Sequence, residues 1–113
     1  MSAVTTHVLD TALGQPAAGV RVRLERASGG DSAVDGAVIG RASTDRDGRV
    51  TDLGPAELEP GTYRLVFGTG EYSRAQQPFF PEVTVTFTVA DRDRHYHVPL
   101  LLSPFGYSTY RGS

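Results

Sequence analysis

Two segments of the chain alternate apolar and polar residues with a period of two, and this period constrains the fold more than any other feature. Within Gly19 to Arg26, residues 20–25 read V-R-V-R-L-E, and residues 83–89 read V-T-V-T-F-T-V. Successive side chains of a β-strand point to opposite faces, so each segment predicts a strand with one buried face. The β-branched residues of the second segment also favour a pleated, half-buried surface.

The other segments are typical of short strands separated by turns. We expect further strands at Val4 to Thr11, Val38 to Thr44, Tyr63 to Phe67, His95 to Leu102 and Gly106 to Arg111. The sequence Asp45-Arg-Asp-Gly48 has the composition of a turn, in which Gly48 is free to adopt a positive φ. The small, polar residues 27–36 predict a mobile hairpin connection, and Glu71 to Gln77 favours a short helix that ends before Pro78.

About eight strands and one short helix predict an all-β fold in which two sheets pack face to face. At 113 residues the chain is long enough for one two-layer core of this kind and too short for a second. We therefore expect a single domain that spans residues 1–113.

Composition excludes several kinds of chemistry. The chain has no cysteine, so a disulfide, a thiolate nucleophile and a cysteine zinc site are all impossible. A net charge of -2 gives no field that would attract nucleic acid or an anionic membrane. No run approaches the roughly 20 apolar residues of a membrane helix, and residues 1–7 lack the pattern of a secretory signal. Any catalysis must use histidine, carboxylate, hydroxyl or arginine side chains.

His95 and His97 are two residues apart in an expected strand, so their side chains leave one face while Tyr96 leaves the other. Both imidazoles could reach one cavity. Such a pair is also a zinc or copper pattern, but a third ligand would have to be His7 or a carboxylate, and no second cluster is close in sequence. We expect no metal site, and for His95 a structural role at the start of the strand.

The remaining candidates each have an ordinary structural interpretation. A lone strand histidine such as His7 more often packs or faces solvent, an arginine after a turn such as Arg49 is usually solvated, and a tail such as Tyr110 to Ser113 is normally frayed. The segment Asp45-x-Asp47-Gly48 is similar to the start of a calcium loop, but the remaining acidic ligands are absent. The residues taken singly leave both the structural and the functional interpretation open.

Several longer motifs, however, match one family. They are His7-Val-Leu-Asp10 followed by Gly14-Gln-Pro16-Ala, Asp47-Gly48-Arg49, Phe79-Phe80-Pro81, Leu100-Leu-Leu-Ser-Pro104 and Tyr110-Arg-Gly-Ser113. In these motifs the chain resembles the 5-hydroxyisourate hydrolases, the transthyretin-related enzymes of purine catabolism. The match runs from near residue 7 to the last residue, and the connection from Ala27 to Val38 is the stretch that departs from it.

The resemblance implies a transthyretin-like β-sandwich of two four-stranded sheets with one short helix. It also implies dimers paired edge to edge, which pack face to face into a homotetramer with a central channel. In such an assembly His7, His97 and Tyr110 share the face toward the channel, and each active site forms between subunits. We also expect a cytoplasmic enzyme without a cofactor and, from the charge and composition, neither nucleic acid nor a membrane as a partner.

The implied reaction is the hydrolysis of 5-hydroxyisourate to 2-oxo-4-hydroxy-4-carboxy-5-ureidoimidazoline, by addition of water to an amide carbonyl of the six-membered ring. His7 and His97 are the candidate bases, and Arg49 would orient the substrate and stabilise developing charge. Tyr110 would close the pocket and Ser113 would position water or substrate. Arg111 is included among the substrate-binding residues, with bracing of the tail as its alternative role.

A second function is also compatible with this fold. The related transthyretins carry hormone in the same channel without chemistry, so the alternative is a small-molecule carrier. Two imidazoles, Arg49 and the bulky Tyr110 argue against it, because a carrier of a large apolar ligand needs an open, unreactive channel. The fold by itself does not separate the two functions.

Overall fold

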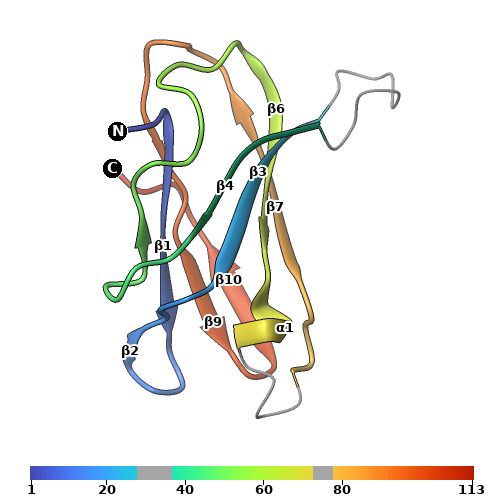
Figure 1. Cartoon of the computed structure of the whole chain (residues 1–113). Helices are drawn as coiled ribbons and strands as arrows, with labels where there is room; N and C mark the ends of the chain where they lie inside the picture. Colours follow the sequence, from blue (N-terminus) through green and yellow to red (C-terminus); the bar gives the residue numbers. More distant parts are fainter. Residues whose placement is uncertain (28–36, 73–77) are drawn as a thin grey trace.

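The computed structural model describes residues 1–27, 37–72 and 78–113. These residues form ten strands and one short helix. In chain order the elements are β1 (Val4–Asp10), β2 (Gln15–Pro16), β3 (Arg21–Ala27), β4 (Ala37–Ser43), β5 (Arg49–Val50), β6 (Gly61–Phe67), α1 (Thr69–Tyr72), β7 (Val83–Val89), β8 (Tyr96–His97), β9 (Leu100–Ser103) and β10 (Gly106–Thr109). Figure 1 shows two sheets that face each other, with α1 at one end of the sandwich.

One sheet is antiparallel and has four strands in the order β4-β3-β6-β7. Leu24 of β3 lies opposite Gly40 of β4 and Leu65 of β6, and both leucines are fully buried. The two segments with a period of two are β3 and β7, so the strongest strand predictions are confirmed. The polar partners in these strands, such as Arg21 and Thr84, are exposed on the outer face.

The second sheet contains six strand segments that form four rows. The central row is β1, which pairs in parallel with β8 and β9 on one side and antiparallel with β5 and β2 on the other. The outermost row is β10, which pairs with β9. The expected architecture of two four-stranded sheets is therefore confirmed, although the two strands expected nearest the C-terminus differ in detail.

The prediction of one continuous strand from His95 to Leu102 was wrong, because the ladder is interrupted between β8 and β9. Pro99 lies in this interruption, and a proline has no N–H to donate to a neighbouring strand. The strand expected from Gly106 to Arg111 ends at Thr109, after which Gly112 alone forms a bridge to His97.

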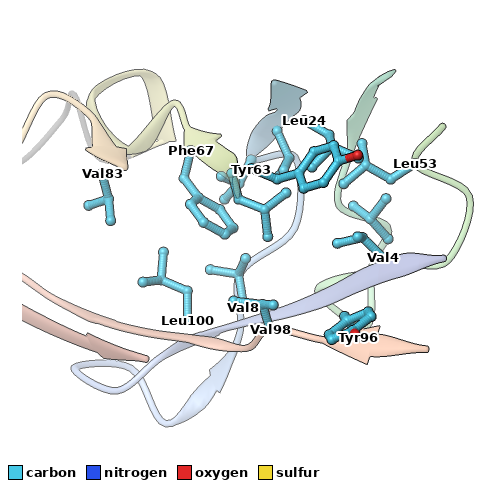
Figure 2. Packing of buried hydrophobic residues seen from close by; sticks show 14 of the residues in the cluster. Val4, Val8, Leu24, Leu53, Tyr63, Phe67, Val83, Tyr96, Val98 and Leu100 are labelled. Atoms are coloured by element: carbon cyan, nitrogen blue, oxygen red, sulfur yellow. The ribbon is translucent and has the colours of Figure 1, made fainter. Parts of the chain in front are cut away.

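The core lies between the sheets and unites side chains from both (Figure 2). Val8 of β1 and Leu100 of β9 pack toward Leu24 and Phe67 of the facing sheet, and all four are fully buried. The buried Tyr96 places its hydroxyl where the backbone N–H groups of residues 90 and 91 donate to it. Within the described ranges no buried side-chain nitrogen or oxygen lacks a hydrogen-bond partner.

The helix begins earlier than expected. It starts at Thr69 rather than Glu71, and the N–H of Gly70 donates to the carbonyl of Pro81, which ties α1 to the segment before β7. The rest of the expected helix, residues 73–77, and the expected hairpin connection over 28–36 lie outside the described residues. No helix in the described ranges is long and apolar enough to cross a membrane.

Candidate active site

The outer face of the second sheet brings together the side chains that the sequence motifs singled out. In β1, Val8 is fully buried in the core, and the alternation of the strand therefore directs Thr5 and His7 to the opposite face. Register pairs His7 with Arg49 of β5 and Thr5 with His97 of β8. Paired residues of neighbouring strands share a face, so His7, Arg49 and His97 lie on one surface.

A tight turn before β5 fixes Arg49 beside His7. The Asp45 carboxylate accepts hydrogen bonds from the backbone N–H groups of Asp47 and Arg49, each at 2.9 Å. Gly48 has a φ of 76°, and a Cβ there would lie 2.4 Å from the carbonyl oxygen of Val8. Only glycine fits this conformation and this close approach to β1, so the expected turn is confirmed.

Hydrogen bonds within this turn also affect the charge of the Asp45 carboxyl and the position of the proton on the His7 ring. The backbone N–H of Arg49 is the main reason that the pKa of the Asp45 carboxyl lies below its ordinary value. His7 lies 2.8 Å through Nε2 from the carbonyl oxygen of Asp47. A carbonyl can only accept, so Nε2 of His7 carries a proton, and Nδ1 is the nitrogen that can accept one when this ring is neutral.

His97 and His95 meet at one hydroxyl group. The Oγ1 atom of Thr5 lies 2.8 Å from Nδ1 of His97 and 3.1 Å from Nε2 of His95. Thr5 is buried and His97 is half-buried, whereas the side chain of His95 is exposed. The prediction that His95 and His97 leave the same face is therefore confirmed.

The surroundings of His97 favour its neutral form. Burial is the main reason that the pKa of His97 lies below its ordinary value of 6.5, and the positive charges of Arg49, His95 and His7 act in the same direction. An imidazole with a lowered pKa is neutral at pH 7, and the neutral form is the one that can accept a proton from water. The electrostatics thus favour the proton-accepting form of His97.

The C-terminal tail lies against His97 instead of fraying. The N–H of Gly112 donates to the carbonyl oxygen of His97 at 2.8 Å. The guanidinium of Arg111 lies over the ring of Tyr96, 4.7 Å from the ring centre. Tyr96 is on the core side of β8, away from the histidine face, so this stacking braces the tail and does not bring Arg111 to the histidines.

The other two tail residues occupy more open positions. Tyr110 is 56% exposed. It lies two residues before Gly112, the residue that bridges to His97, so alternation along the tail directs Tyr110 to the same face as Gly112. Ser113 follows Gly112 directly and is also exposed. Both side chains are thus open to solvent in the single chain.

The site is a surface and not a cleft. His7 and His97 are half-buried, and Arg49 is exposed. A groove of about 650 Å³ lies on the opposite sheet beside Arg21, Arg23 and Arg41. Within the described ranges, no group of three or more His, Cys, Asp or Glu side chains is placed to hold a metal ion.

Sequence reasoning missed two residues of this surface, Thr5 and Gly112. Thr5 could have been found from its position two residues before His7 in one strand, which gives both the same face. Gly112 carried no signal of its own, because its contact with His97 depends on how the tail returns across β8.

Fold and site together define a two-layer β-sandwich of the transthyretin type that carries a histidine and arginine site on the outer face of one sheet. The sequence matches the HIUase/Transthyretin family over residues 4–112, and the chain belongs to this family. The resemblance expected from the motifs is thereby confirmed.

Individual relatives agree with this assignment. The chain is 50% identical to the 5-hydroxyisourate hydrolase 2 of Rhizobium meliloti, over 97% of this chain and 95% of that protein. It is 51% identical to the uric acid degradation bifunctional protein TTL of Arabidopsis thaliana, over 97% of this chain but 37% of that longer protein.

Solved structures show the same fold. The 5-hydroxyisourate hydrolase of Klebsiella pneumoniae superimposes with a TM-score of 0.82 and 36% identity, covering 97% of this chain and 98% of that one. Transthyretin from Sparus aurata superimposes with a TM-score of 0.86 and 27% identity, covering 99% of this chain and 97% of that one. The fold is thus shared by a hydrolase and a transthyretin.

Proposed function

We propose that this chain is a 5-hydroxyisourate hydrolase, which converts 5-hydroxyisourate to 2-oxo-4-hydroxy-4-carboxy-5-ureidoimidazoline. The observation that carries the proposal is the convergence of His7, His97 and Arg49 on one sheet face, with the pKa of His97 lowered. The Rhizobium meliloti and Klebsiella pneumoniae proteins to which the chain is similar are both named 5-hydroxyisourate hydrolases.

In the proposed reaction, neutral His97 accepts a proton from water while the water oxygen bonds to a carbonyl carbon of the six-membered ring. The carbonyl oxygen becomes an oxyanion, and the guanidinium of Arg49 stabilises this developing charge. When the oxyanion collapses, the ring C–N bond breaks and the nitrogen takes the proton from His97. The base returns to its neutral state, and no cofactor is consumed.

The remaining site residues act on binding in this proposal. The fixed Nε2–H of His7 leaves Nδ1 free to contact the substrate or the attacking water. Tyr110 would cover the bound ring, and Ser113 would position water or substrate at the end of the tail. Arg111, which we included among the substrate-binding residues, is better supported as a brace because it stacks on Tyr96.

We further propose that the active form is a homotetramer with sites between subunits. The single chain leaves His97 and Arg49 on an open surface, whereas amide hydrolysis benefits from a site that excludes bulk water. Beside the edge strand β10 lies a patch of aromatic rings in edge-to-face contact, with Phe79 64% and Phe105 79% exposed. Exposed aromatic patches of this kind are typical of subunit interfaces.

The proposal includes a cytoplasmic location. It is supported by the metabolic role stated for the Arabidopsis thaliana relative, a protein of uric acid degradation.

The alternative function is that of a small-molecule carrier, and one solved structure of the same fold is an example of it. A sea bream transthyretin of the same fold, 27% identical to this chain, was solved in complex with thyroxine. The hydrolases of Klebsiella pneumoniae and Rhizobium meliloti are more similar to this chain in sequence, at 36% and 50% identity.

One experiment separates hydrolase from carrier. The ultraviolet absorbance of freshly made 5-hydroxyisourate is followed with and without the purified protein, and with His97→Asn as the matched control. Decay that is accelerated by the wild-type protein and not by the variant supports the hydrolase. Equal decay in all three samples contradicts it.

A further inference from the structure

The hydroxyl of Thr5 lies between two imidazoles, and it has one proton to donate. Oγ1 is 2.8 Å from Nδ1 of His97 and 3.1 Å from Nε2 of His95. Thr5 is only 4% exposed, so water has little access to the hydroxyl. Its position is fixed by the parallel register that places Thr5 directly beside His97.

A hydroxyl can donate one hydrogen bond and accept two. Thr5 can therefore donate to one imidazole only, and the other imidazole must donate to it if both hydrogen bonds are to form. In one arrangement Thr5 donates to His95, and Nδ1–H of His97 donates to Thr5. In the other arrangement His95 donates to Thr5, and Thr5 donates to Nδ1 of His97. An arrangement in which both rings donate would leave the buried hydroxyl proton without an acceptor, which costs free energy.

The two arrangements give His97 opposite chemistry. In the first, a neutral His97 carries its proton on Nδ1, so Nε2 has a free lone pair. In the second, the proton is on Nε2, and this nitrogen can only donate. The partner of one ring nitrogen thus decides the role of the other.

We propose that Thr5 is a positioning residue, which accepts a hydrogen bond from Nδ1 of His97, donates to Nε2 of His95, and so keeps Nε2 of His97 unprotonated for the substrate. The inference rests on the proposed function, because hydrolysis requires a base and only this arrangement leaves His97 able to act as one through Nε2. Thr5 touches no substrate in this scheme. It acts by fixing the ring orientation and the tautomer of His97, while exposed His95 provides the acceptor that selects that tautomer.

Two substitutions at Thr5 separate the hydroxyl from the shape of the side chain. Thr5→Val keeps the branched shape and removes the hydroxyl, and Thr5→Ser keeps the hydroxyl. We expect kcat of Thr5→Val to fall roughly 10- to 100-fold with KM nearly unchanged, as for other groups that orient a functional histidine. We expect Thr5→Ser to retain activity within about threefold, because the hydrogen-bonding group is preserved.

The matched control is Thr11→Val, which removes a hydroxyl from the residue that follows β1, where it donates to the carbonyl of Leu102. We expect wild-type kcat for this variant. Thermal midpoints of all variants show whether a loss of rate reflects unfolding. Wild-type kcat in folded Thr5→Val, or an equal loss in folded Thr5→Ser, would overturn the inference.

A second measurement needs no substrate. The imidazole ¹⁵N shifts of His97, recorded in the wild-type protein at a pH where the ring is neutral, report which nitrogen carries the proton. We expect a protonated Nδ1 in the wild type and a mixture of tautomers in Thr5→Val. A protonated Nε2 in the wild type would overturn the inference. Failure of the proposed function would appear separately, as a wild-type protein that does not accelerate the decay of 5-hydroxyisourate.

Discussion

Gly112 lies against the imidazole of His97 so closely that a Cβ atom built on it would come within 2.6 Å of Cδ2 of the ring. The same glycine donates its N–H to the carbonyl oxygen of His97, so the tail cannot move away from the ring without losing this hydrogen bond. The absence of a side chain at residue 112 is thus what allows the tail to reach the candidate base.

Gly112→Ala should displace either the ring of His97 or the tail. We expect kcat for 5-hydroxyisourate to fall roughly 10- to 100-fold, because misplacement of a catalytic group by about 1 Å has effects of this size. The control is Gly106→Ala, where an added Cβ would meet only the Ser103 hydroxyl, at 3.5 Å. Unchanged turnover of Gly112→Ala would show that the contact with His97 has no role in the reaction.

His97→Asn should reduce turnover by roughly two to four orders of magnitude, which is the usual contribution of a positioned base. His95→Asn should have a milder effect, because the exposed ring of His95 acts at a distance from the substrate. Initial rates of absorbance decay measure both, and circular dichroism shows whether each variant is folded. A larger loss for His95→Asn than for His97→Asn would reverse the assignment of the base.

The rate should also depend on pH in a direction set by His97. Its pKa lies below 6.5, and the base is active when neutral, so activity should be full above this value and fall as the pH drops through the lowered pKa. The pH profile of kcat/KM measures the midpoint of this loss. A midpoint above 6.5 would contradict the account in which burial and neighbouring positive charges keep His97 neutral.

Substitution of the exposed aromatic patch should test the proposed assembly. Phe105, which is 79% exposed in the single chain, would be buried between subunits, and burial of a phenylalanine contributes about 1.5–3 kcal/mol. We expect Phe105→Ser to yield smaller species in sedimentation velocity and to lose activity with them. Val38→Ser, on β4 of the other sheet and 38% exposed at this position, is the control and should remain assembled.

Two outcomes would contradict the proposed assembly. If the wild-type protein sediments as an active monomer at assay concentration, the proposal of sites shared between subunits is wrong. An assembled Phe105→Ser variant with normal activity would instead place the interface elsewhere on the surface.

The period of two in β3 and β7 was enough to predict two strands with one buried face, because this alternation is a local property of the backbone. The interruption at Pro99 was missed, although a proline within an expected strand is a warning that the ladder stops. The start of α1 was missed because Gly70 is tied by a hydrogen bond to Pro81, in the segment before β7, and propensity within the helix does not report this contact.

The sequence by itself determined the alternation that makes an all-β sandwich, the turn chemistry of Asp45 to Gly48 and the identity of His7, His97 and Arg49 as candidates. Only the tertiary structure decided that His7 pairs with Arg49, that Thr5 joins the rings of His95 and His97, and that Gly112 lies against His97. The physical reason is that alternation and turn preference act between neighbouring residues. Register and the return of the tail, in contrast, are set by packing between strands that are far apart in the chain.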